Sequence, residues 1–183
     1  MQLYLVRHAA VVVRPEQPSN QWHLSPEGRA AAESLAAEPA GWATLARLYS
    51  SSEPKAIATA QRIAMRNGLS ITIEATLREV ERPWSGGDYR ALARSYLGGE
   101  PIDGWEPCDV ATARIRRAIE TIASSHGEAG VGLVSHGLIL SLYVAGLFGL
   151  DGPATAELWE GIGFPDYAIV DPKARTLVRP FAG

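Results

Sequence analysis

The chain has 183 residues, of which 46% are apolar and 20% charged, and its formal net charge at pH 7 is −3. This composition suits one globular domain with a hydrophobic core and excludes a disordered or fibrous protein. No basic excess indicates nucleic acid or an anionic membrane as a partner. The single cysteine, Cys108, excludes an intramolecular disulfide and a cysteine-based zinc site, and cytoplasmic localisation is the default expectation.

The predicted elements alternate between short apolar strands and helices. A strand at 3–6 ends in charge, and a loop at 9–24 precedes a helix that starts at Ser25-Pro26-Glu27 and stops at Pro39-Ala40-Gly41. Further strands are predicted at 45–50, 70–74 and 131–135, and further helices at 54–65, 88–97, 110–125 and from 138 onward.

This order predicts a three-layer α/β sandwich, with a mostly parallel sheet covered by helices on both faces. Segments 167–170 and 176–179 flank Asp171-Pro172-Lys173 and predict a C-terminal hairpin. We expect a single domain over residues 1–183, with residues 80–106 as a small lid or cap. The start of the chain does not have the pattern of a signal peptide, and the apolar run at 138–150 is too short to span a membrane.

Candidate functional residues follow the predicted strands. Because ligands of parallel sheets bind beyond the carboxyl ends of the strands, residues at these ends are expected to gather at one edge. Cationic and imidazole groups there suit a phosphoryl group, and the amides that open a helix favour an anion. The residues at this edge are Arg7-His8, Lys55, Glu79 and His136-Gly137.

Several motifs in chain order resemble those of the histidine phosphatase superfamily, also called phosphoglycerate-mutase-like. They are the LYLVRH run at 3–8, the block LSPEG at 24–28, YSSSEPKAIATA at 49–60, LREV at 77–80 and VSHG at 134–137. The resemblance implies a phosphatase that acts through a phosphohistidine intermediate on a small phosphorylated metabolite, without a cofactor or a metal.

The resemblance also implies a role for each matched residue. His8 corresponds to the nucleophile, Arg7 to the first phosphate-binding arginine, Glu79 to the proton donor and His136 to the second histidine of the phosphate pocket. Lys55 and Gly137 are expected to contact the phosphoryl group.

Three departures from the family pattern stand out. Ala9 replaces the usual glycine, Lys55 replaces the second phosphate-binding arginine, and Arg82-Pro83 stands where an aromatic-glycine pair is usual. Lysine keeps the charge of arginine but loses its bidentate fork. The third departure predicts a different lid and leaves the substrate open.

Alternative interpretations stay open at this stage. Lys55 also fits the pattern of a solvent-exposed lysine in the first turn of a helix. Glu74 and Glu81 are alternatives to Glu79 as the proton donor. Asn20 is either a substrate contact or a solvated loop residue. A phosphomutase on the same scaffold, a phospho-ligand-binding module and a metal hydrolase are the rival functions. The oligomeric state is open.

Overall fold

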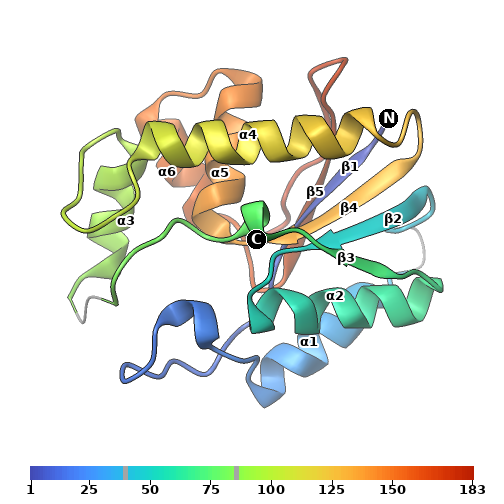
Figure 1. The fold of residues 1–183 in the computed structure, drawn as a ribbon, viewed down its shortest axis with the longest axis horizontal. Helices are drawn as coiled ribbons and strands as arrows, with labels where there is room; N and C mark the ends of the chain where they lie inside the picture. The colour runs from blue at the N-terminus through green and yellow to red at the C-terminus, as the bar shows by residue number, and fades with distance from the viewer. Residues whose placement is uncertain (39–40, 85–86) are drawn as a thin grey trace.

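The computed structural model describes residues 1–38, 41–84 and 87–183, and a mixed sheet lies at its centre (Figure 1). In these residues the sheet has six strands in the order β3-β2-β4-β1-β5-β6. The strands are β1 (Leu3–Arg7), β2 (Leu45–Ser50), β3 (Ile71–Ile73), β4 (Gly130–Ser135), β5 (Asp166–Asp171) and β6 (Thr176–Arg179).

The strand directions follow the predicted pattern. β1 pairs in parallel with β4, and β2 pairs in parallel with both β4 and β3. β5 runs antiparallel to β1 on its other side and forms the C-terminal hairpin with β6. The mostly parallel sheet and the terminal hairpin are therefore confirmed.

Helices cover both faces of the sheet (Figure 1). α1 (Pro26–Ala36) and α2 (Pro54–Asn67) lie on one face, and α4 (Cys108–Ser124), α5 (Gly137–Phe148) and α6 (Gly152–Glu160) lie on the other, next to α3 (Tyr89–Leu97). The side chains of β1 alternate accordingly: Leu3 and Leu5 enter the core with α4 and α5, whereas Tyr4 and Val6 pack with α1 and α2. This arrangement confirms the three-layer sandwich.

Some element boundaries differ from the predictions. α6 was not predicted, although Asp151 caps its first turn by accepting the amide of Ala154. α4 begins at Cys108 instead of Val110, and the loop at 9–24 contains a short 3-10 helix, η1 (Ser19–Gln21). The predicted helix stop at residues 39 and 40 lies outside the described residues.

The segment predicted as a lid, residues 80–106, holds α3 in its described part. Before it, the 3-10 helix η2 (Ala75–Leu77) leads from β3 to Glu79. None of the helices in the described ranges combines the length and the apolar character that a membrane-spanning helix needs.

Candidate active site

Two histidines meet at the carboxyl edge of the sheet. β1 and β4 are parallel neighbours in register, with Arg7 opposite Ser135. The next residues, His8 and His136, therefore come together, and their ring centroids lie 5.1 Å apart. Their exposed fractions are only 6% and 0%, so both rings are shielded from bulk water.

The hydrogen bond of His8 fixes its tautomer. Nδ1 lies 2.7 Å from the carbonyl oxygen of Ala9, and a carbonyl only accepts, so Nδ1 carries the proton. Burial, together with the nearby His136 and Lys55, places the pKa of His8 well below its ordinary value. The imidazole is therefore neutral at pH 7, with a lone pair on Nε2.

His136 has one ring nitrogen bonded and one without a partner. Nε2 lies 2.8 Å from Ser51 Oγ and 3.3 Å from Glu53 Oε1, whereas the buried Nδ1 has no hydrogen-bond partner in the described residues. Burial also places the pKa of His136 well below its ordinary value. An unpaired polar atom at this depth is costly unless a ligand satisfies it.

Arg7 brings a buried cation beside the two histidines. One of its Nη atoms donates to the carbonyl of Ile162, the ring of Phe164 lies over the guanidinium at 3.4 Å, and Nε has no partner among the described residues. Burial lowers the pKa of Arg7 to about 10, so the group stays charged at pH 7.

Gly137 is required beside Arg7 for steric reasons. A Cβ at this position would lie 2.9 Å from Arg7 Cζ, which is closer than non-bonded carbon atoms approach. The backbone of Ala9, in contrast, lies outside the left-handed region, so the alanine that replaces the usual glycine is accommodated.

Lys55 is buried and already paired. Its Nζ lies 2.5 Å from Glu53 Oε2 and donates to the carbonyl of Ser19 at 2.7 Å. The interpretation of Lys55 as a surface lysine is thus wrong, since only 5% of the residue is exposed.

Glu53 is a site residue that the sequence did not reveal. Besides Lys55 and His136, its carboxylate accepts the backbone amide of Glu79 at 2.9 Å, and only 6% of the residue is exposed. An acid at the start of a helix is common because it favours the helix dipole, so the motif alone gives no sign of this role. Its position two residues before Lys55 becomes informative only with the structure, which shows that Lys55 is buried.

Glu79 lies at the N-terminus of α5. Its carboxylate accepts the amides of Leu138 at 3.2 Å and Ile139 at 3.0 Å, in addition to that of Val80. These helix amides, expected to hold a phosphoryl group, are therefore occupied by a carboxylate. Burial raises the pKa of the Glu79 carboxyl, against the opposing charge of Arg82.

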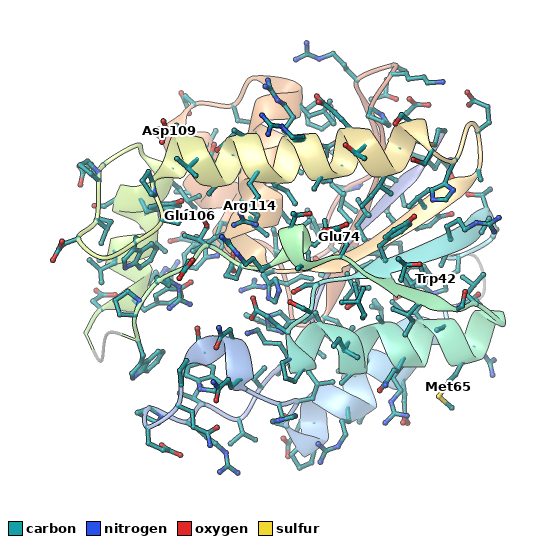
Figure 2. The ribbon with its side chains drawn as sticks, viewed as in Figure 1. Trp42, Met65, Glu74, Glu106, Asp109 and Arg114 are labelled. Atoms are coloured by element: carbon teal, nitrogen blue, oxygen red, sulfur yellow. The ribbon has the colours of Figure 1, made fainter. Side chains whose placement is uncertain are left out.

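An ion-pair network fixes the segment that carries Glu79. Figure 2 shows Glu106 and Arg114 side by side below the first half of α4. Arg114 donates to both carboxylate oxygens of Glu106 and to the backbone carbonyls of Thr76, Arg78 and Glu79. Although burial opposes it, hydrogen bonds from Arg114 and Arg78 lower the pKa of Glu106 to about 2, so the network persists across the neutral range.

A cavity of about 480 Å³ opens next to these groups. Glu53 and Glu79 form part of its wall, and the exposed Asn20 of η1 lines it as well. Asn20 therefore borders the cavity, but it makes no side-chain hydrogen bond to His8, Arg7 or His136. The described residues contain no group of three or more His, Cys, Asp or Glu side chains that could hold a metal ion.

Comparisons with known proteins agree with this geometry. The family model of the histidine phosphatase superfamily (branch 1) matches residues 3–159. No curated protein matches the chain in sequence.

Solved structures share its fold. A mycobacterial glucosyl-3-phosphoglycerate phosphatase is 25% identical, with a TM-score of 0.77, over 93% of this chain and 92% of its own. Bacillus stearothermophilus YhfR is 22% identical, with a TM-score of 0.78, over 100% and 96% of the two chains. An Entamoeba histolytica phosphoserine phosphatase is 18% identical, with a TM-score of 0.74, over 100% and 95%.

Because the family model covers most of the chain, the protein belongs to the histidine phosphatase superfamily. This confirms the resemblance drawn from the motifs, and with it the prediction of a phosphatase enzyme.

Proposed function

We propose that the protein is a phosphomonoesterase that acts through a phosphohistidine on a small phosphorylated metabolite. The observation that carries the proposal is the state of His8. It is a neutral imidazole with a protonated Nδ1 and a free Nε2, beside the cation of Arg7 and the unpaired Nδ1 of His136. A free imidazole lone pair next to the unsatisfied N–H donor of Arg7 suits nucleophilic attack on phosphorus.

In the first half of the reaction, His8 Nε2 attacks phosphorus and the ester P–O bond breaks as the P–N bond forms. Glu79 gives its proton to the leaving oxygen. Its raised pKa supports this role, since a general acid must hold a proton at the working pH. In the second half, Glu79 takes a proton from water as the water oxygen attacks phosphorus. The P–N bond breaks as the new P–O bond forms, and inorganic phosphate leaves with His8 neutral again.

The phosphoryl oxygens need hydrogen-bond donors that are not already bonded to other groups of the protein. Arg7 Nε is unpaired, and Lys55 has three N–H groups, of which two go to Glu53 and Ser19. The third N–H of Lys55 is left for the substrate. His136 offers its Nδ1 once it takes up a proton, which a bound dianion would favour.

The test is chemical trapping of the intermediate. Acid-sensitive, base-stable phosphate should be found on the wild-type enzyme quenched during turnover, and His8→Ala should lose both the label and phosphate release. His23→Ala is the matched control, because His23 is exposed in the loop after the nucleophile. Turnover by His8→Ala at the wild-type rate would rule the proposal out.

Product analysis of the same reactions separates the phosphatase from a phosphomutase. A phosphatase releases one inorganic phosphate for each substrate consumed, whereas a mutase returns an isomer of the substrate. Phosphate binding without turnover in the wild type would instead favour a phospho-ligand-binding module.

A further inference from the structure

Glu53 contacts three groups of the proposed reaction at once. Its Oε2 lies 2.5 Å from Lys55 Nζ, and its Oε1 lies 3.3 Å from His136 Nε2 and accepts the backbone amide of Glu79 at 2.9 Å. Only 6% of Glu53 is exposed, so little water surrounds this carboxylate. These contacts fix both carboxylate oxygens and hold a negative charge beside the ring of His136.

The contact with Glu53 decides which nitrogen of the neutral His136 ring carries the proton. A carboxylate oxygen only accepts, so a proton on Nε2 is favoured over a lone pair there, and Ser51 Oγ at 2.8 Å can accept that proton. The lone pair of the ring is then on Nδ1, the atom that has no partner in the described residues. Because a lone pair repels a phosphoryl oxygen, His136 can bind phosphate only after a second proton has reached Nδ1.

Positive charges near His136 oppose this second proton. Burial lowers the pKa of the ring, and four cations lower it further: Lys55, Arg7, Arg114 and Arg82. A phosphate dianion beside Arg7 and Lys55 offsets their charges and so favours protonation. The imidazolium that results is buried, and a buried charge needs a partner of opposite sign on its Nε2 side as well.

Glu53 supplies this partner, whereas its titratable neighbours are uncharged. Glu79 reaches the same helix end, but in the proposed mechanism it holds a proton when the substrate binds. His8, whose ring centroid lies 5.1 Å from that of His136, is neutral. The negative charge that faces Nε2 of His136 is therefore that of Glu53.

We propose that Glu53 is a positioning residue of the phosphate site, which acts through His136: its carboxylate allows the ring to take up a proton from solvent as phosphate binds. The protonated Nδ1 then donates to a phosphoryl oxygen, Nε2 keeps its proton throughout, and the added proton returns to solvent when inorganic phosphate leaves. This inference rests on the proposed function and adds to it the counter-charge of the phosphate site.

Nitrogen NMR of the histidine rings tests the proposal without turnover. Inorganic phosphate is the probe, the protein carries nitrogen-15 in its histidines, and the signals of His136 are assigned by their loss in His136→Gln. At pH 7 without phosphate, Nδ1 of His136 should resonate as an unprotonated ring nitrogen. With saturating phosphate, both ring nitrogens should resonate as protonated ones. A His136 ring that stays neutral in the wild type at saturating phosphate overturns the proposal.

The variant Glu53→Gln removes the charge but keeps an oxygen that can accept the amide of Glu79. In its phosphate complex, the midpoint of His136 protonation should fall by about 1 to 2 pH units, which is about 10- to 100-fold weaker proton binding. Glu53→Asp keeps the charge and should shift the midpoint less. An unchanged midpoint in Glu53→Gln, or equal shifts in both variants, would contradict a role of the charge.

Glu81→Gln is the matched control. Glu81 lines the same 480 Å³ cavity, but it is exposed and lies 3.6 Å from Arg78. The midpoint of His136 protonation in its phosphate complex should stay at the wild-type value. A shift as large as that of Glu53→Gln would show that any nearby carboxylate has this effect and would also contradict the proposal.

The results separate this inference from the proposed function. Phosphate trapped on His8 of a protein whose His136 stays neutral would support the phosphatase mechanism and overturn the role of Glu53. Protonation of His136 that depends on Glu53, in a protein that releases no phosphate from any ester, would support the role of Glu53 and reject the phosphatase.

Discussion

Glu79 combines two features that usually oppose each other in a carboxyl group. Three backbone amides donate to it, which favours the charged form, yet burial raises its pKa. The amides fix the orientation of the carboxyl group, and burial favours its protonated form. Both features support the general-acid role that we propose for Glu79.

Removing the carboxyl proton of Glu79 should slow the hydrolysis of different substrates to different extents, depending on their leaving groups. Glu79→Gln keeps the shape of the side chain but has no carboxylic acid proton to donate. We expect a loss of about 10²- to 10⁴-fold in kcat for alkyl phosphates, whose alkoxide leaves poorly, and a much smaller loss for 4-nitrophenyl phosphate. Steady-state rates on the two substrates check this.

Glu81→Gln is the control, since Glu81 is exposed and lies 3.6 Å from Arg78. A large loss of kcat that is selective for alkyl phosphates in the Glu81 variant, with little effect in the Glu79 variant, would assign the general-acid role to Glu81.

At the residue scale, the sequence predicted the groups that follow strands directly. Arg7, His8 and His136 come together because parallel strands in register end at the same edge. Glu53 was not predicted because its burial depends on tertiary contacts, among them that with His136, which lies far from it in the sequence. No local pattern distinguishes such an acid from one that faces solvent.

At the element scale, the N-terminus of α5 has little room beside β1. The amides of its first turn hold Glu79, and Gly137 gives the space in which the Arg7 guanidinium lies. One helix end thus positions both Glu79 and Arg7, to which we assign the general acid and a phosphate contact.

Gly137→Ala should therefore lower the catalytic activity while the protein still folds. Its Cβ would push the guanidinium of Arg7 aside, and we expect about a 10- to 100-fold loss in kcat/KM, as for one charge-assisted contact. The thermal midpoint should change little, because alanine is the better helix residue and offsets part of the strain.

Gly146→Ala in the same helix is the matched control, since nothing lies within 4 Å of a Cβ there. It should stabilise the protein by up to about 1 kcal/mol and keep full activity. Activity and thermal unfolding of both variants are the measurements, and wild-type kcat/KM in Gly137→Ala would refute the steric role.

The element that the sequence did not predict, α6, shows where local patterns mislead. Gly152-Pro153 looks like a turn, but Asp151 accepts the amide of Ala154 and the proline stands in the first turn, where its missing N–H costs nothing. The helix is then stabilised by its buried face, including Ala156 and Trp159. Packing against α3 and α5, which the sequence does not show, decided the outcome.

At the scale of the whole molecule, the two buried histidines connect stability to pH. Burial lowers the pKa of both His8 and His136 in the folded protein, whereas each returns to about 6.5 on unfolding. Below that pH the unfolded chain binds more protons than the folded one. The free energy of unfolding should therefore fall with decreasing pH, by up to about 1.4 kcal/mol per pH unit for each histidine.

Urea unfolding between pH 7 and pH 5 measures this slope, in a range above the titration of carboxylates with a lowered pKa, such as that of Glu106. Glu79, whose pKa is raised by burial, contributes with the opposite sign and makes the wild-type slope smaller. His8→Gln should reduce the slope by about half, and His23→Gln, at an exposed position, should leave it as in the wild type. Equal stability of the wild type at pH 7 and pH 5 would contradict the prediction.

The pairing of β1 with both β4 and β5 bears on when this site can assemble during protein synthesis. His136 and the residues that anchor and cover Arg7, Ile162 and Phe164, lie far after His8 in the chain. Because β1 lies between two strands that are synthesised after it, the ribosome delivers His8 before the groups that enclose it. The pocket around His8 therefore forms only after β4 and β5 have been synthesised.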